Sequence, residues 1–172
     1  MIKVGINGFG RIGRLILRAL LENYKGKIQV VGINDLGSIE ANAHLIKYDS
    51  THGTLIQDVK TSAEGFQIGD QNIKVFAERD PAKLPWGKIG ADVVLECTGF
   101  FLDKNSAGKH IEAGAKKVII SAPAKEVDFT VVQGVNSKDL KKEHNIISNG
   151  SCTTNCLAPV AMVLENTFGI EY

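Results

Sequence analysis

The sequence has few of the features that mark a disulfide-stabilised protein or a binder of large polyanions. Its 172 residues include only three cysteines, four prolines and 6% aromatic residues. Three cysteines, at positions 97, 152 and 156, form no even disulfide framework, which predicts free thiols in a reducing compartment. Twenty Lys and Arg residues against 19 Asp and Glu give a net charge of +1, which offers no global field for binding nucleic acid or a membrane surface.

Long hydrophobic runs and repeats are also missing. No segment reaches the roughly 18 apolar residues of a membrane span, and residues 1–7 lack the apolar core of a secretory signal. We therefore expect a cytoplasmic protein without nucleic-acid or membrane partners. No linker rich in Pro or Ser occurs, so a change of domain is expected at Asn149-Gly150 without a flexible spacer.

Short Val- and Ile-rich runs alternate with longer stretches of helical spacing, a pattern typical of βα units. Strands are expected at 2–7, 28–34, 73–77, 93–97, 118–121, 130–134 and 146–148. Helices are expected at 11–24, 38–47, 106–113 and 152–167, with a short helical turn at 137–143. Turn signals between 49 and 90 predict excursion strands and loops. The predicted fold class is α/β, a doubly wound and mostly parallel sheet.

A glycine-rich turn follows the first strand. Gly8, Gly10 and Gly13 fit G-x-G-x-x-G, which is a weak signal alone but here directly follows an apolar strand and opens an amphipathic helix. In this motif Gly8 makes the tight turn, Gly10 admits a pyrophosphate and Gly13 packs helix on strand. Arg11 and Arg14 lie early in the helix, where a cation opposes the macrodipole. Each is a phosphate ligand or merely solvated, and Arg11 is the better candidate.

An acidic residue ends the second strand. Asp35 stands 22 residues after Gly13, close to the spacing at which the motif places a ribose-binding carboxylate. A 2′-phosphate there would bring like charges together, at a cost of ~4 kcal/mol for a separation of about 4 Å and an effective dielectric near 20. The sequence therefore predicts NAD rather than NADP. The alternative is that Asp35 only caps the next helix.

A cysteine is expected in the first turn of the last helix. Ser151 can cap that helix, and its free amides and dipole should lower the pKa of Cys152 and make it a nucleophile. Cys156 shares a helix face with Cys152, so a metal pair is an alternative, although Cys156 is more simply a small core residue. Cys97 is expected to be buried and inert. Pro159 predicts a kink or a restart of the helix.

Five segments together resemble the glyceraldehyde-3-phosphate dehydrogenase family over the whole chain. They are NGFGRIGR at 7–14, NDL at 34–36, YDSTHG at 48–53, ECTG at 96–99 and SCTTNC at 151–156. The last run is highly specific. Gly150 departs from the small residue, such as Ala, that the family usually has there, and it adds backbone freedom before the cysteine.

The resemblance implies an NAD-dependent enzyme of glycolysis that oxidises D-glyceraldehyde 3-phosphate with inorganic phosphate. It implies Cys152 as the nucleophile, with Ser151 and Thr153 contacting substrate and phosphate. It also implies a homotetrameric parent and no metal. The implied NAD-contacting residues, beyond the motif glycines, are Arg11, Ile12, Asp35, Arg79, Thr98, Gly99 and Ser121.

The resemblance also implies a general-base His beyond the position of Tyr172. His44, His52, His110 and His144 do not match it; His52 belongs to the YDSTHG motif and the others are interpreted as surface or helix residues. We therefore expect an NAD-binding Rossmann domain at 1–149 and the start of a truncated catalytic domain at 150–172. Such a chain would bind NAD with little or no turnover. The alternatives are an erythrose-4-phosphate dehydrogenase, which shares these motifs, or a non-catalytic NAD-binding module.

A truncated chain would expose a face of its last helix. The apolar residues expected to lack packing partners there are Leu157, Val160, Ala161, Val163 and Leu164.

Overall fold

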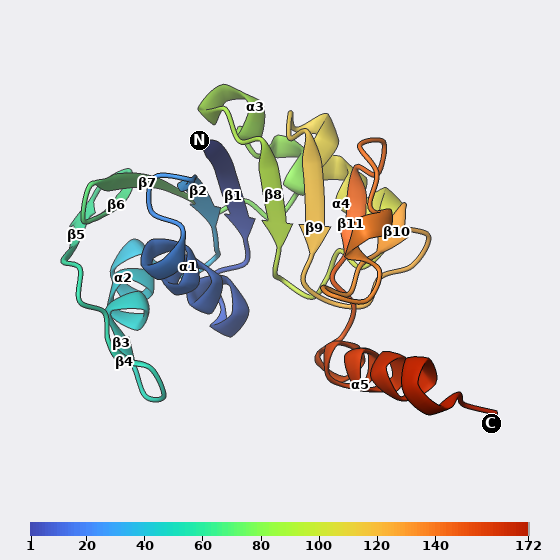
Figure 1. Cartoon of the computed structure of the whole chain (residues 1–172). Coiled ribbons are helices and arrows are strands. Elements are labelled where there is room, and N and C mark those ends of the chain that lie inside the picture. Colours follow the sequence, from blue (N-terminus) through green and yellow to red (C-terminus); the bar gives the residue numbers. More distant parts are fainter. Residues whose placement is uncertain (172) are drawn as a thin grey trace.

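A single sheet of nine strands forms the centre of the computed structural model, which describes residues 1–171 (Figure 1). The strand order is β10-β11-β9-β8-β1-β2-β7-β6-β5. All pairings from β10 to β7 are parallel, whereas β6 and β5 continue the sheet antiparallel. The strands are β1 (Ile2–Asn7), β2 (Ile28–Asn34), β5 (Val59–Ser62), β6 (Gly65–Ile68), β7 (Gln71–Phe76), β8 (Val93–Glu96), β9 (Lys117–Ile120), β10 (Phe129–Thr130) and β11 (Ile146–Ser148). The predicted doubly wound, mostly parallel sheet is confirmed.

Helices cover both faces of the sheet (Figure 1). One face packs on α1 (Arg11–Asn23) and α2 (Ile39–Lys47) through a cluster that includes Ile6, Leu17 and Ile46. The other face packs on α3 (Trp86–Ile89) and α4 (Lys104–Glu112) through clusters that contain Trp86 and Ala107. Because side chains alternate along a strand, β1 can serve both layers.

Trp86 packs directly against the backbone of the central strands. A Cβ atom at Gly5 would lie 2.6 Å from Trp86 Cζ3, and one at Gly32 would lie 2.6 Å from the Cδ1 atom of Ile89. Glycine at both positions therefore lets α3 approach the sheet closely.

The segment from 47 to 90 adds the elements that the sequence left open. A hairpin of β3 (Tyr48–Asp49) and β4 (Gly53–Thr54) follows α2, and a 3-10 helix at Pro81–Lys83 precedes α3. The expected turn at 137–143 is a shorter 3-10 helix, Ser137–Asp139.

Helix α4 starts two residues before the expected Ser106. Asp103 caps it, since its Oδ1 atom accepts a hydrogen bond of 2.8 Å from the Ser106 amide.

The last helix, α5 (Cys152–Phe168), extends away from the sheet after β11 (Figure 1). None of its residues is buried; Leu157 is 67% and Phe168 is 81% exposed. The expected exposure of Leu157, Val160, Val163 and Leu164 is confirmed, and Ala161 is half-buried. No helix among residues 1–171 has both the length and the apolar content of a membrane span.

A restart of the helix at Pro159 is not observed, because α5 continues through this residue and a proline within a helix removes only one backbone donor. The alternative of a kink at Pro159 stays a prediction. Cys156 is exposed rather than a core residue, because α5 buries no side chain against the sheet.

Candidate cofactor-binding site

A cleft of about 480 Å³ opens at the carboxyl ends of the central strands. Strand β1 pairs with β2 on one side and with β8 on the other. The connection after β1 leads to β2 and the connection after β8 leads to β9, in opposite directions, so the sheet has its switch point between β1 and β8. Doubly wound sheets bind ligands at this point. The cleft is lined by residues that include Asn7, Gly8, Asp35, Arg79, Thr98 and Phe100.

The three motif glycines have distinct environments. Gly8 has φ +90°, and a Cβ there would lie 2.7 Å from the amide nitrogen of Thr98. A Cβ at Gly13 would lie 2.2 Å from the carbonyl oxygen of Gly8, whereas Gly10 has open space around it. Gly8 and Gly13 therefore have the turn and packing roles that the motif predicts, and Gly10 leaves room for a ligand to approach the backbone.

The beginning of α1 offers free hydrogen-bond donors. Its N-cap, Gly10, has no side chain to cap the helix, and the first turn contains no acidic residue. The first amides of a helix have no partner within the helix, and they carry the positive end of the macrodipole. This terminus therefore fits the pyrophosphate of a dinucleotide.

Asp35 joins two loops at the edge of the cleft. Its Oδ2 atom accepts a hydrogen bond of 2.9 Å from the Phe9 amide, and its Oδ1 atom accepts one of 2.8 Å from the Gly37 amide. Helix α2 is capped by Ser38, whose hydroxyl accepts from the Ala41 amide at 3.1 Å. The alternative that Asp35 merely caps this helix is therefore wrong. Its carboxylate lines the cleft, where it can reach a ribose.

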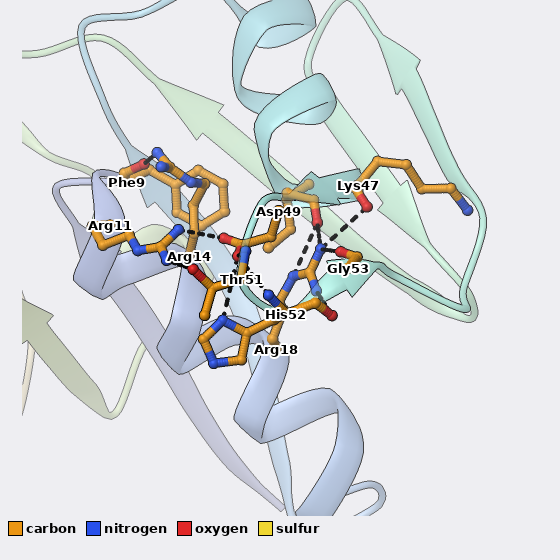
Figure 2. Close-up of polar contacts among 10 residues, drawn as sticks. Phe9, Arg11, Arg14, Arg18, Lys47, Asp49, Thr51, His52 and Gly53 are labelled. Carbon is orange, nitrogen blue, oxygen red and sulfur yellow. Dashed lines mark hydrogen bonds and ion pairs between the residues drawn. The ribbon is translucent and has the colours of Figure 1, made fainter.

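Arg11 points toward the β3–β4 hairpin (Figure 2) and is not among the residues that line the cleft. Its guanidinium pairs with Asp49 at 2.5 Å and donates to the Thr51 hydroxyl at 3.1 Å. The backbone amides of His52 and Thr51, followed by the His52 side chain and Arg11, hold the pKa of Asp49 well below its usual range. Arg11 is therefore committed to the hairpin here, and its role as a phosphate ligand stays a prediction.

Arg18 is a structural residue that the sequence analysis missed. It is 5% exposed, and its guanidinium donates to the carbonyl oxygens of Ile46, Lys47, His52 and Gly53 at 2.8 to 3.4 Å (Figure 2). These bonds tie α1 to the end of α2 and to the hairpin. The spacing of Arg11, Arg14 and Arg18 along one side of α1 was the available signal.

The other residues implied by the resemblance divide into two groups. Arg79 and Thr98 line the cleft, whereas Ile12, Gly99 and Ser121 are not among its lining residues. Cys97 lines the cleft and is half-buried; burial raises the pKa of its thiol to about 12, in keeping with the expected inert thiol.

Cys152 begins α5, as predicted, and is exposed. The predicted cap is also confirmed, because the Ser151 hydroxyl accepts a hydrogen bond of 2.9 Å from the Thr154 amide. Thr153 is exposed, and its hydroxyl lies 2.7 Å from that of Ser151. Gly150 has φ +66°, a conformation that disfavours residues with a Cβ atom.

Cys152 has no hydrogen bond to any of the four histidines within residues 1–171. The same residues include no group of three or more potential metal ligands, so nothing extends the alternative of a Cys152–Cys156 metal pair.

A buried polar network beneath the cleft was also missed. Asn7, Asn34 and Glu96 are register partners that end β1, β2 and β8, and all three are buried. They hydrogen-bond to one another, and Glu96 reaches His110 of α4 at 2.9 Å. His110 was interpreted as a surface or helix residue; it is helical but completely buried. The available signal was a polar residue at the end of each of three apolar strands.

The chain matches known proteins of one kind. Residues 2–104 match the family model described as glyceraldehyde 3-phosphate dehydrogenase, NAD binding domain. The chain is 54% identical over 170 residues to glyceraldehyde-3-phosphate dehydrogenase of Xanthobacter flavus, and 56% identical over 170 residues to that of Geobacillus stearothermophilus. It is 55% identical over 171 residues to glyceraldehyde-3-phosphate dehydrogenase 1 of Bacillus subtilis.

These matches cover 98% or 99% of this chain and 50% or 51% of each relative, so the chain spans about half the length of the curated relatives it matches. NAD is the cofactor of the matched domain, in agreement with the open Gly10 and the uncapped start of α1. The chain belongs to the glyceraldehyde-3-phosphate dehydrogenase family, whose NAD-binding domain it contains.

Proposed function

We propose that this chain supplies the NAD-binding half and the nucleophile of a phosphorylating glyceraldehyde-3-phosphate dehydrogenase. The reaction is the NAD-dependent oxidation of D-glyceraldehyde 3-phosphate to 1,3-bisphosphoglycerate, a step of glycolysis in the cytoplasm. The observation that carries the proposal is the combination of a dinucleotide cleft at the switch point with a cysteine in the first turn of α5.

The cleft and its rim would hold the cofactor. Amides around Gly10 face a pyrophosphate, Asp35 accepts from a ribose, and Arg79 and Thr98 line the remaining walls. Arg11, Ile12, Gly99 and Ser121 are proposed contacts by family resemblance alone. The bound cofactor supplies a hydride acceptor.

Cys152 provides the covalent chemistry. Its sulfur, in the first turn of α5, adds as a thiolate to the aldehyde carbon, and the carbonyl oxygen takes up a proton to give a thiohemiacetal. Loss of hydride from that carbon and of the proton from its hydroxyl leaves a thioester, and inorganic phosphate then attacks the acyl carbon and releases the thiolate. Ser151 and Thr153 place hydroxyls beside Cys152, where they can bind the substrate or phosphate oxygens.

The two parts of the chain have different proposed roles. We assign cofactor binding to 1–149 and the start of the catalytic domain to 150–172. Because none of the histidines in residues 1–171 bonds to Cys152, the 172-residue chain by itself should bind NAD with little or no turnover. The active protein would include the half that the relatives have in addition, and its assembly would be a homotetramer.

The test is formation of NADH by the complete protein, given NAD, phosphate and D-glyceraldehyde 3-phosphate. Cys152→Ser should abolish the reaction, whereas the matched control Cys156→Ser should retain most of it. Faster turnover of erythrose 4-phosphate would instead favour the tetrose-phosphate enzyme. Binding of NAD without turnover of either substrate by the complete protein would favour a non-catalytic NAD-binding module.

A further inference from the structure

A continuous chain of hydrogen bonds crosses the carboxyl ends of four neighbouring strands under the cleft. It starts at the backbone of Glu78, which follows β7, and passes through Asn34 of β2 and Asn7 of β1 to Glu96 of β8. From Glu96 it continues to His110 and ends at the indole of Trp86.

The groups at the two ends of this series of hydrogen bonds determine which atoms donate and which accept along it. The Glu78 amide donates to Asn34 Oδ1 and the Glu78 carbonyl accepts from Asn34 Nδ2, both at 2.8 Å, so the Asn34 amide has one possible orientation. Asn34 Nδ2 then donates to Asn7 Oδ1 at 2.7 Å, which turns the Asn7 amino group toward Glu96. Asn7 therefore presents only a hydrogen-bond donor to Glu96, since its Oδ1 atom already faces Asn34.

The other end gives the tautomer of His110. An indole N–H can only donate, so His110 Nδ1, at 2.9 Å from Trp86 Nε1, must accept. His110 is therefore neutral, with its proton on Nε2, from which it donates to Glu96 Oε2 at 2.9 Å.

Glu96 consequently accepts four hydrogen bonds. Its Oε2 atom accepts from Asn7 and His110, and its Oε1 atom accepts from the amide and hydroxyl of Thr98 at 2.7 and 2.5 Å. The Thr98 hydroxyl oxygen in turn accepts from the Phe100 amide. Four donors fill the sites of a carboxylate, and Glu96 is only 1% exposed. None of the groups bonded to it carries a positive charge.

We propose that Glu96 is a buried, ionised positioning residue that makes the cleft favour the oxidised cofactor over the reduced one. Its bonds to Thr98 hold the loop that lines the cleft at the end of β8. Asp35 and the start of α1 would hold the adenosine and pyrophosphate on the β1–β2 side. The nicotinamide half of the dinucleotide would then lie on the β8 side, toward Glu96.

The charge of Glu96 would act on the ring that changes charge during the reaction. The oxidised nicotinamide is positive and the reduced one is neutral, so an uncompensated carboxylate attracts only the oxidised form. This inference rests on the proposed NAD-dependent function and adds a determinant of redox-state preference. The cation among the lining residues, Arg79, belongs to the segment after β7 on the adenosine side.

The test compares NAD, NADH and ADP-ribose as ligands of the chain by calorimetric titration. In Glu96→Gln, the ratio of the dissociation constant for NAD to that for NADH should rise at least about threefold. The lost attraction between the Glu96 carboxylate and the positive nicotinamide, acting across the cleft at an effective dielectric of about 20, is large enough to give such a change. Glu96→Asp keeps the charge and should leave the ratio within about twofold. The matched control Glu112→Gln changes the same charge on the exposed end of α4 and should leave all three affinities unchanged.

The outcomes separate this inference from the function on which it rests. Equal weakening of NAD and NADH in Glu96→Gln would show that Glu96 only shapes the loop, and would overturn the inference while leaving NAD binding intact. No binding of any ligand by the unaltered chain would overturn the proposed assignment of cofactor binding to residues 1–149, and the inference with it.

A second measurement applies if Glu96→Gln does not fold. Nitrogen-15 NMR of the unaltered chain should show His110 with a bare Nδ1 and a protonated Nε2, beside the single indole signal of Trp86. Imidazolium signals at neutral pH would mean that His110 compensates Glu96, and would overturn the inference.

Discussion

The cleft and the cysteine helix differ in how they are held in place. Around the cleft, backbone positions are fixed several times over, by glycine packing, by Asp35 and by the network through Glu96. Helix α5 has a side-chain cap at its start but no buried residue along its length. The cofactor half is therefore determined by its own sequence, whereas the position of Cys152 depends on contacts that α5 does not make here.

The largest expected difference between the two regions is in how much the truncation of an apolar side chain lowers the free energy of unfolding. Leu17 of α1 is completely buried, so Leu17→Ala should lower the free energy of unfolding by about 3 kcal/mol through lost burial and a cavity. Leu157→Ala in α5 should change it by less than about 0.5 kcal/mol. Urea denaturation of both variants gives the comparison. A comparable loss in Leu157→Ala would mean that α5 packs on the sheet in solution.

Two glycines of the same motif offer the next contrast. Gly13→Ala places a methyl group against the Gly8 carbonyl and should cost about 2 kcal/mol of stability, because α1 must move from β1. Gly10→Ala meets no atom within 4 Å and should leave stability within about 0.5 kcal/mol while weakening NAD binding. Thermal unfolding with and without NAD distinguishes the two effects. Equal stability of both variants would refute the packing role of Gly13.

The smallest expected effect concerns Asp128, which precedes β10 and holds the start of β11, the last strand before α5. Asp128 accepts from Lys104 at 2.6 Å and from the amides of Asn145 and Ile146, and these bonds lower the pKa of its carboxyl to about 2. Because the folded pKa lies below the unfolded value near 3.9, this stabilisation is present above about pH 4 and is lost as the pH falls toward 2.

Asp128→Asn should therefore cost about 1 kcal/mol at pH 7 and clearly less at pH 2, where about half of the Asp128 carboxyl groups of the folded protein are protonated. Denaturation at several pH values measures it, with Asp139→Asn, at the exposed end of a 3-10 helix, as the control. An equal cost at both pH values would mean that shape rather than charge matters at Asp128.

Most of the fold followed from local sequence patterns, because the strands and helices that build it each have a strong period and clear ends. Strands β1, β2 and β11 have the predicted bounds, α2 begins one residue inside its predicted range, and α5 begins directly after its predicted cap, Ser151. The glycine turn and Asp35 were also found, since their spacing reflects a local unit of strand, turn, helix and strand.

What escaped prediction depends on pairs that are distant in the sequence. His110 bonds to residues 14 and 24 positions away, and the sheet order that places β8 beside β1 brings Asn7 within reach of Glu96, 89 positions away. Arg18 likewise contacts carbonyl groups 28 to 35 positions away. Cys156 was misplaced for a different reason, since helix periodicity identifies an apolar face but not whether anything packs against it.

Calorimetric titration of the 172-residue chain with NAD and with NADP tests the central claim most directly. The account predicts saturable binding of NAD and at least tenfold weaker binding of NADP, because the carboxylate of Asp35 at the edge of the cleft repels a 2′-phosphate. Asp35→Asn should reduce that preference. Equal binding of the two cofactors, or binding of neither, would contradict the claim that this sequence alone builds an NAD-selective site.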